Sequence, residues 1–226
     1  MLKTILKTLT VLLLISHLSC KKDSTLPPVD MGYDYFPTTI GQWIIYDVDS
    51  IDFNDYTQSV DSFQFQIKEL IESSFLDNQG RQVERIERYF RPNDTIPWVL
   101  SDVYTSTRTE MHAERFEENV TYIKMAFPIK YNLIWDCNAT NSLDAQDCYY
   151  ETIHVPHTEN GNSFDSTITV FQDEFITLIS KDFSKEIYAK NIGLISKEVV
   201  HVTLDPPTGK ITSGVDYKYS INSYGK

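Results

Sequence analysis

Apolar and polar residues alternate along most of the chain beyond about residue 40. Phe63, Phe65, Ile67 and Ile71 fall on one face of an extended segment, with polar side chains on the other face. This period of two is typical of a half-buried β-strand. Comparable β-prone runs predict further strands at residues 43–48, 83–90, 98–107, 120–127, 167–171, 198–204 and 211–221.

Short polar turns separate these runs. Asp77–Gly80 predicts one turn, and Asp205–Gly209 predicts the turn of a C-terminal hairpin. Residues 175–189 fit either a helical face or a strand. Strands that follow one another without alternating helices indicate an antiparallel sheet. We therefore expect an all-β fold with a single antiparallel domain, either a sandwich or a curved, partly open barrel, with at most one or two short helices.

The N-terminus has the layout of a secretory signal peptide. Lys3 and Lys7 precede an apolar run at residues 9–15, which is too short to span a bilayer as a helix. Leu18-Ser19-Cys20 resembles the end of a bacterial lipobox, although His17 stands where Leu or Val is usual. We expect a signal peptide at residues 1–19, a lipidated tether at 20–34 that begins with Cys20, and a β-rich domain at 35–226.

The lipid anchor would make a membrane the first partner of this protein. Lys21-Lys22-Asp23 is similar to the segment after the lipidated cysteine in many surface lipoproteins of Bacteroidota. That resemblance implies an outer-membrane location, with the domain either periplasmic or exposed at the cell surface.

The charge excludes one class of partner. Removing the signal peptide leaves 18 Lys and Arg residues against 32 Asp and Glu, a formal charge of −14. Such an acidic surface repels nucleic acid. The chain has only 8 glycines, which argues against nucleotide-binding folds built on Gly-rich turns, and we expect no cofactor.

Cys137 and Cys148 are the two cysteines that remain after lipidation. Outside the cytoplasm such a pair most simply forms a disulfide. A redox or metal-binding pair is the alternative interpretation.

The loop between these cysteines has the spacing of a calcium-binding loop. Oxygen-bearing side chains occupy positions 1, 3, 5, 7, 9 and 12, namely Asp136, Asn138, Thr140, Ser142, Asp144 and Asp147. Asn141 stands where an EF-hand needs Gly, position 12 is Asp rather than Glu, and no helices flank the loop. We expect a solvated polar loop and no metal.

Two further clusters have both a chemical and a structural interpretation. His154, His157 and Glu159 could ligate zinc, but residues three apart on a strand point to opposite faces. The run Glu84–Arg88 could supply a catalytic carboxylate, but such a carboxylate needs a shielded pocket, so we expect cross-strand charge pairs that face solvent.

Aromatic residues invite a glycan-binding interpretation. Trp43, Trp98 and Trp135 lie in apolar segments, so we expect them to pack in the core or at its rim, and we expect Tyr149 and Tyr150 to be more exposed.

Several Asp-(Ser/Thr)-X triplets resemble the O-glycosylation acceptor of Bacteroidota envelope proteins. Since a transferase needs an exposed, flexible segment, Ser24 and Thr95 are the candidate acceptors, and Ser50 and Ser166, at strand borders, are less accessible.

The opening of the domain carries a family resemblance. Residues 35–46 (YFPTTIGQWIIY) look like the start of a broad group of Bacteroidota lipoproteins, and Phe127-Pro128 with Trp135-Asp136, Glu186–Ala189 and Ile192–Ile195 look like its later landmarks. The group has no agreed function to carry over. Its architecture is similar to the open β-barrels of lipoprotein carriers, which is an analogy of fold only.

These observations favour a non-enzymatic envelope lipoprotein that acts as a binding or accessory module for a glycan, a small molecule or a protein partner. One alternative is an envelope hydrolase with a dispersed acidic site, which would show buried carboxylates and His in a concave pocket. The other is a carrier of an apolar ligand in an open β-barrel, which would show a large apolar cavity.

Overall fold

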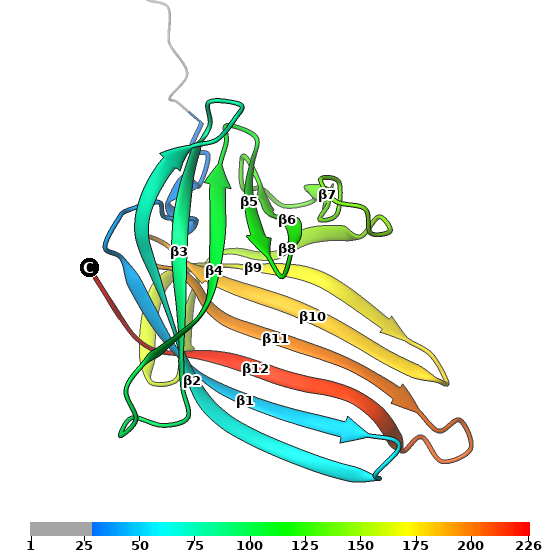
Figure 1. Cartoon of the computed structure of the whole chain (residues 1–226). Coiled ribbons are helices and arrows are strands. Elements are labelled where there is room, and N and C mark those ends of the chain that lie inside the picture. The colour runs from blue at the N-terminus through cyan, green and yellow to red at the C-terminus, as the bar shows by residue number, and fades with distance from the viewer. Residues whose placement is uncertain (1–28) are drawn as a thin grey trace, which may run out of the picture.

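The computed structural model describes residues 29–226 and contains one antiparallel sheet of twelve strands (Figure 1). The strands are β1 (Trp43–Asn54), β2 (Ser59–Leu76), β3 (Gln82–Arg91), β4 (Val99–Arg108), β5 (His112–Glu117), β6 (Val120–Ala126), β7 (Ile134–Asp136), β8 (Asp147–Glu159), β9 (Asn162–Ile176), β10 (Ser180–Ala189), β11 (Gly193–Leu204) and β12 (Ile211–Gly225). The predicted all-β antiparallel fold is confirmed.

The first and last strands pair at the centre of the sheet. The strand order is β6-β5-β4-β3-β2-β1-β12-β11-β10-β9-β8-β7. The β1–β12 pairing runs from Trp43 opposite Gly225 to Phe53 opposite Gly214. The two halves of the chain therefore form two meanders joined along this seam.

The sheet curls until its two outer strands meet at one end. The backbone N–H of Ile123 in β6 donates to the carbonyl of Cys137, 2.9 Å away, and Trp135 Nε1 donates to the Ile123 carbonyl at 3.0 Å. Strand twist and register shifts, such as those in the β1–β12 and β10–β11 pairings, bend the sheet into this shape. Of the two predicted architectures, the structure is the curved, nearly closed barrel.

The strands predicted from alternation are all present, and most extend beyond the residue ranges that the sequence predicted. Residues 175–189, which fitted either a helix or a strand, form the end of β9, a turn at Thr177 and β10. The sequence did not predict β5, β7 and β8. In β8 the alternation is broken by a register shift at His154, whose φ is 55°, and by another near Pro156.

One end of the barrel is filled by the largest apolar cluster. Tyr35, Met125, Ile168 and Cys148 are fully buried there, with Phe36, Ala113, Phe127, Ile129, Cys137, Tyr150, Val170 and Tyr188 around them. The 3-10 turn η1 (Tyr33–Tyr35) leads the chain into this cluster. Gly32 has φ 78°, and a Cβ there would lie 2.5 Å from Ile129 Cδ1, so the close approach requires glycine.

Packing begins before the predicted domain boundary. Met31 accepts a backbone hydrogen bond from Ile129, and Tyr33 packs edge-on against Phe127, so the last residues of the predicted tether contact the barrel. Over residues 29–226, η1 is the only helical element, and no helix there is long and apolar enough to cross a membrane. The predicted signal peptide, Cys20 and Ser24 lie outside the described residues.

Candidate functional site: a charged cleft inside the barrel

Charged residues occupy inward positions on several strands. Glu69 lies between Ile67 and Ile71 on β2, and because alternate residues share a face, its side chain points into the barrel. Arg88 on β3 and Lys197 on β11 are placed in the same way. These charged side chains line the barrel interior where apolar residues would otherwise pack.

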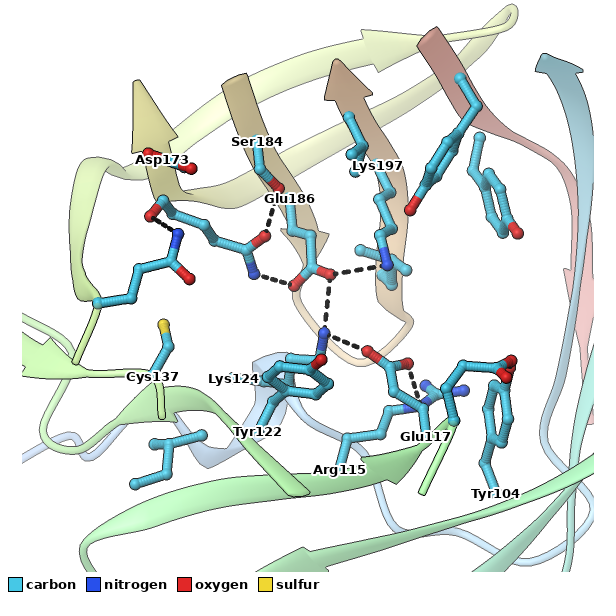
Figure 2. A pocket seen from close by; sticks show the side chains of 18 of the residues that line it. Tyr104, Arg115, Glu117, Tyr122, Lys124, Cys137, Asp173, Ser184, Glu186 and Lys197 are labelled. Carbon is cyan, nitrogen blue, oxygen red and sulfur yellow. Dashed lines mark hydrogen bonds and ion pairs between the residues drawn. The ribbon is translucent and has the colours of Figure 1, made fainter. Parts of the chain in front are cut away.

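The inward charges surround an open cleft of about 550 Å³ (Figure 2). Its walls come from β2–β6, β9–β12 and the loop before β8. The lining residues are Glu69, Arg88, Tyr104, Arg115, Glu117, Glu118, Tyr122, Ile123, Lys124, Cys137, Leu143, Gln146, Gln172, Asp173, Ser184, Glu186, Tyr188, Leu194, Lys197, Val199, His201, Tyr217 and Tyr219. The volume falls in the range of ordinary small-molecule sites.

Lys124 is the centre of the ion-pair network. Its Nζ lies 2.6 Å from Glu117 Oε1 and 3.1 Å from Glu186 Oε1, so one ammonium joins β5 to β10 across the barrel (Figure 2). Glu186 also accepts hydrogen bonds from Gln172 Nε2 at 2.9 Å and Tyr188 Oη at 2.6 Å. Glu186 is thus held by groups from β6, β9 and β10, and Glu117 shares the Lys124 ammonium with it.

A second branch of the network is formed by two arginines. Arg115 Nη2 lies 2.7 Å from Glu69 Oε2, and its Nε lies 3.6 Å from Glu117 Oε2. Both contacts are ion pairs, and neither nitrogen has a hydrogen-bond partner with good geometry among the described residues. Arg88 lies 3.7 Å from Glu69 and 3.6 Å from Asp102, and its Nε is also buried without a partner.

The protonation states follow from this pairing. Burial alone would raise the pKa of Glu117, but Lys124, Lys197 and Arg115 lower it well below its usual value. The pKa of Glu186 is lowered in the same way, against the effect of burial, by Lys124 and Lys197. Burial would lower the pKa of Lys197, yet Glu117 and Glu186 raise it above its usual value. Glu117, Glu186 and Lys197 are therefore ionised at neutral pH.

Tyrosines line the side of the cleft formed by β4 and β12. Arg88 Nη2 donates to Tyr219 Oη at 2.5 Å, and Arg88 Nη1 donates to Tyr104 Oη at 3.3 Å. Tyr217 packs beside Tyr219, with ring centroids 5.6 Å apart. This wall offers flat aromatic surface and hydroxyl groups next to fixed positive charge.

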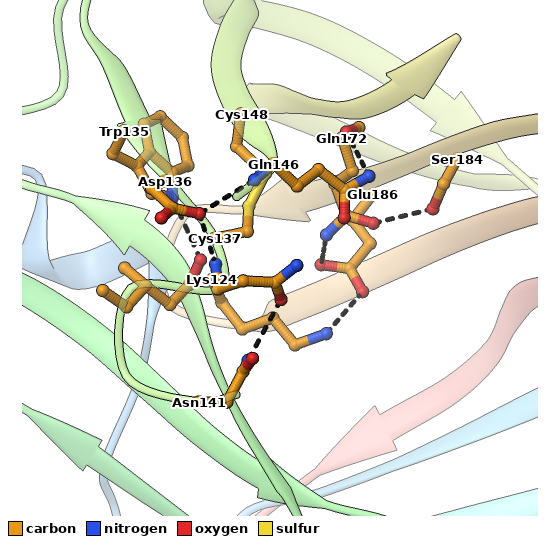
Figure 3. Close-up of a disulfide and its surroundings, with 12 residues drawn as sticks. Lys124, Trp135, Asp136, Cys137, Asn141, Gln146, Cys148, Gln172, Ser184 and Glu186 are labelled. Atoms are coloured by element: carbon orange, nitrogen blue, oxygen red, sulfur yellow. Dashed lines mark hydrogen bonds and ion pairs between the residues drawn. A yellow bond between two sulfur atoms is a disulfide. The ribbon is translucent and has the colours of Figure 1, made fainter. Parts of the chain in front are cut away.

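The disulfide loop forms the opposite wall (Figure 3). The structure joins Cys137 to Cys148, with Cα atoms 5.9 Å apart. Asp136 Oδ1 accepts the backbone N–H groups of Asn138 at 2.8 Å and of Gln146 at 2.9 Å. Gln146 then donates to the carbonyl of Gln172, which fixes the loop against β9.

The residues with the spacing of a calcium-binding loop form hydrogen bonds within the disulfide loop. Asn138 donates from Nδ2 to the Asp144 carbonyl and accepts from Asn141, while Asp147 pairs with Asp136 in the β7–β8 ladder. Within residues 29–226, no group of three or more His, Cys, Asp or Glu side chains is arranged to hold a metal ion.

The histidine pair is separated by the irregular course of β8. His154 Nδ1 lies 2.7 Å from Tyr35 Oη, whereas His157 Nε2 lies 3.2 Å from Glu159 Oε2. Glu159 is paired in addition with Lys218 at 3.1 Å. The two imidazoles thus contact different partners.

The interpretation of Glu84–Arg88 as a solvent-facing run was only half right. Arg85 faces outward and pairs with Glu72 at 2.9 Å and Glu87 at 2.6 Å. Glu84 and Arg88 point inward instead. Glu84 is 1% exposed and Arg88 enters the cleft, because alternation sends every second residue of β3 into the barrel.

The aromatic candidates are mostly structural. Trp135 packs on Tyr150, Trp98 lies under the Arg91 guanidinium at 4.2 Å, and Trp43 covers Gly225. The expectation that Tyr150 is exposed was wrong, because its ring is buried and its hydroxyl donates to the Ala126 carbonyl at 2.7 Å. Tyr149 is partly exposed and stacks on Phe171.

Thr95 lies in the exposed loop between β3 and β4, where its hydroxyl donates to Asn93 Oδ1 at 2.6 Å. This candidate acceptor is accessible. Ser24 lies outside the described residues.

No protein-family model and no curated protein matches this sequence. Two solved structures are similar in fold. One is described as an exported protein with a YmcC-like fold from Bacteroides fragilis, and the other as a lipoprotein from Parabacteroides distasonis. Each has a TM-score of 0.46 and 10% sequence identity, and each match covers 84% of this chain and 98% of the other. A likeness at this level does not identify a function.

Proposed function

We propose that this protein is an envelope lipoprotein that binds a polar small molecule or sugar in the cleft of its barrel. The observation that carries the proposal is the open cleft of about 550 Å³, lined by an ionised network rather than filled by apolar side chains. Buried charges cost stability unless they are paired, and a protein that needed only a stable barrel would gain more from an apolar interior.

Sequence features at the N-terminus support the envelope location in this proposal. The signal-peptide layout and Leu18-Ser19-Cys20 support export and lipidation of Cys20, and the resemblance of Lys21-Lys22-Asp23 supports an outer-membrane position. In this proposal the lipid holds the barrel at the membrane while the cleft remains open to solvent.

The cleft is a poor match for the carrier alternative. An acyl chain would have to lie against Arg88, Arg115, Lys124 and Lys197 and would offer none of them a hydrogen bond. The hydrolase alternative needs a carboxyl group that exchanges a proton near neutral pH. Glu117 and Glu186 are held ionised by their cations, which suits them to positioning charges.

Equilibrium dialysis tests the binding proposal. Full-length protein in mild detergent is dialysed against the low-mass fraction of its host's envelope, and retained compounds are identified by mass spectrometry. We expect a compound retained by the wild type and lost in the double variant Lys124→Met/Glu186→Gln, which removes the central pair. Lys185→Met, a variant of the exposed Lys185–Glu198 pair, is the matched control.

Tryptophan fluorescence must show that both variants remain folded under the dialysis conditions. Retention of nothing by the wild type, or equal retention by the cleft variant, would contradict the proposal.

A further inference from the structure

The inner network of the cleft carries one positive charge in excess. Four cations, Arg88, Arg115, Lys124 and Lys197, share three buried carboxylates, Glu69, Glu117 and Glu186. Further carboxylates lie outside this network. Asp102 is at the rim, where its side chain is 39% exposed and screened by water. Glu118 accepts a hydrogen bond from Tyr104 Oη, and Asp173 lines the cleft from β9. The excess is therefore local to the ion-paired groups of the network.

The excess is concentrated on two of the four cations. Lys124 and Arg115 each have a carboxylate oxygen within 2.7 Å. Lys197 Nζ lies 3.8 Å from Glu186 Oε1 and donates no hydrogen bond within the described chain. Arg88 has no carboxylate closer than 3.6 Å.

These two underpaired cations lie on either side of one tyrosine. Lys197 and Tyr219 are cross-strand partners in the β11–β12 ladder, so their side chains lie side by side on the inner face. From the other side, Arg88 Nη2 donates to Tyr219 Oη at 2.5 Å. Because that oxygen accepts from Arg88, its own hydrogen is free to donate. An anion beside Tyr219 would meet an ammonium, a guanidinium and a hydroxyl donor.

Across the cleft the lining groups are acceptors. Asp173 on β9 faces the cleft, where burial and the neighbouring Asp182 raise its pKa. Gln146 uses its Nε2 against the Gln172 carbonyl, which leaves Oε1 toward the cleft without a donor from the described residues. This side would repel a second anion but accept hydrogen bonds from hydroxyl groups. The rings of Tyr104 and Tyr217 flank the cationic side, and Tyr122 also lines the cleft.

We propose that the cleft binds an acidic sugar, with its single carboxylate between Lys197 and Arg88 and its hydroxyls toward Gln146 and Asp173. The inference rests on the proposed function and narrows it to one ligand class. The carboxylate completes the charge balance of the network, and the tyrosine rings supply flat surfaces for the sugar ring.

Isothermal titration calorimetry with full-length protein in mild detergent tests the inference. The probes are D-glucuronate, D-glucose as its neutral counterpart, and acetate as a carboxylate without a sugar. We expect D-glucuronate to bind at least tenfold more tightly than either of the others. Lys197→Met should weaken D-glucuronate binding at least tenfold, and the surface control Lys185→Met should leave it unchanged.

Lys197→Met leaves Glu186 paired with Lys124, Gln172 and Tyr188, so the variant is expected to fold, and its urea midpoint checks this. Lys197→Arg, which keeps the charge, should retain part of the binding. D-glucose binding equal to that of D-glucuronate, or unchanged binding by Lys197→Met, would overturn the anion site. Acetate binding as tight as D-glucuronate would overturn the sugar class.

The two proposals fail in different ways. If none of the three probes binds while dialysis still retains a host compound, the acidic-sugar inference is wrong and the binding function stands. If dialysis also retains nothing, both are wrong.

Discussion

Removing the central ammonium, Lys124→Met, is the sharpest test of the charge network. The Lys124 side chain is 7% exposed and that of Glu186 is 2% exposed, so the pair is buried. Breaking a buried pair by removing one partner costs about 3–5 kcal/mol, because the other charge is left uncompensated. In the variant, Glu186 keeps its hydrogen bonds from Gln172 and Tyr188, and Glu117 keeps its ion pair with Arg115 at 3.6 Å. These remaining partners favour the lower end of this cost, about 3 kcal/mol of unfolding free energy.

The loss of unfolding free energy in Lys124→Met should depend on pH. In the wild type the pKa values of Glu117 and Glu186 are lowered by the cations, so their stabilising effect is present above the unfolded pKa and is lost as pH falls through the folded one. In the variant the same carboxylates are buried with less compensation, so their pKa values rise and they destabilise the fold at neutral pH. The difference between variant and wild type should therefore shrink as pH falls below about 5.

Urea unfolding followed by tryptophan fluorescence at pH 7.0 and at about pH 4.5 measures both effects. Lys185→Met is the matched control, because Lys185 and Glu198 are 33% and 36% exposed and such surface pairs contribute less than about 1 kcal/mol. A loss below about 1 kcal/mol for Lys124→Met at pH 7, or a loss independent of pH, would refute the reasoning.

Glu84→Gln should stabilise the fold at pH 7 and have little effect near pH 4. Burial raises the pKa of Glu84, and a carboxyl group whose pKa is raised in the folded state destabilises the fold only above its unfolded pKa. Urea midpoints at the two pH values would check this, and no gain at pH 7 would count against it. Replacing Cys137 and Cys148 by Ser should cost up to about 3 kcal/mol, the loop-closure value for this separation, and alkylation without reductant should add no group to either residue of the wild type. Cys20→Ala should move the protein out of the detergent phase on cell fractionation, and a variant that still partitions as a membrane species would disprove the anchor. Protein from its native host should carry a glycan on Ser24 or Thr95, which glycopeptide mass spectrometry would detect, and unmodified peptides over both residues would end the idea.

Alternation was sufficient to predict the sheet. The strands built on clear period-two patterns were found, because one face of each is buried and register is then strongly specified. β5 and β7 were missed because they are short. β8 was missed because a bulge at His154 and a register shift near Pro156 interrupt its alternation. Barrel and sandwich have the same local pattern, and only long-range pairing of β1 with β12 distinguishes them.

The cleft was only partly visible in the sequence. Glu69, Arg88 and Lys197 each lie in phase with apolar inward residues, and a charge at such a position is a signal for an interior polar site. Glu186 could not be assigned as a partner of Glu117 and Lys124, because it lies on β10, 62 residues after Lys124, and meets them only when the sheet curls. The calcium-like spacing and the histidine pair, which the sequence did show, instead form structural hydrogen bonds, within the disulfide loop and between His154 and Tyr35.

A crystal structure of the protein after dialysis with its host's low-mass envelope fraction would show directly whether the cleft is a ligand site. We expect an occupant inside the barrel, with an acidic group within hydrogen-bond distance of Lys197 Nζ and a ring against the tyrosines of β4 and β12. A compound bound only on the outer face of the sheet, with the cleft filled by water alone, would contradict it.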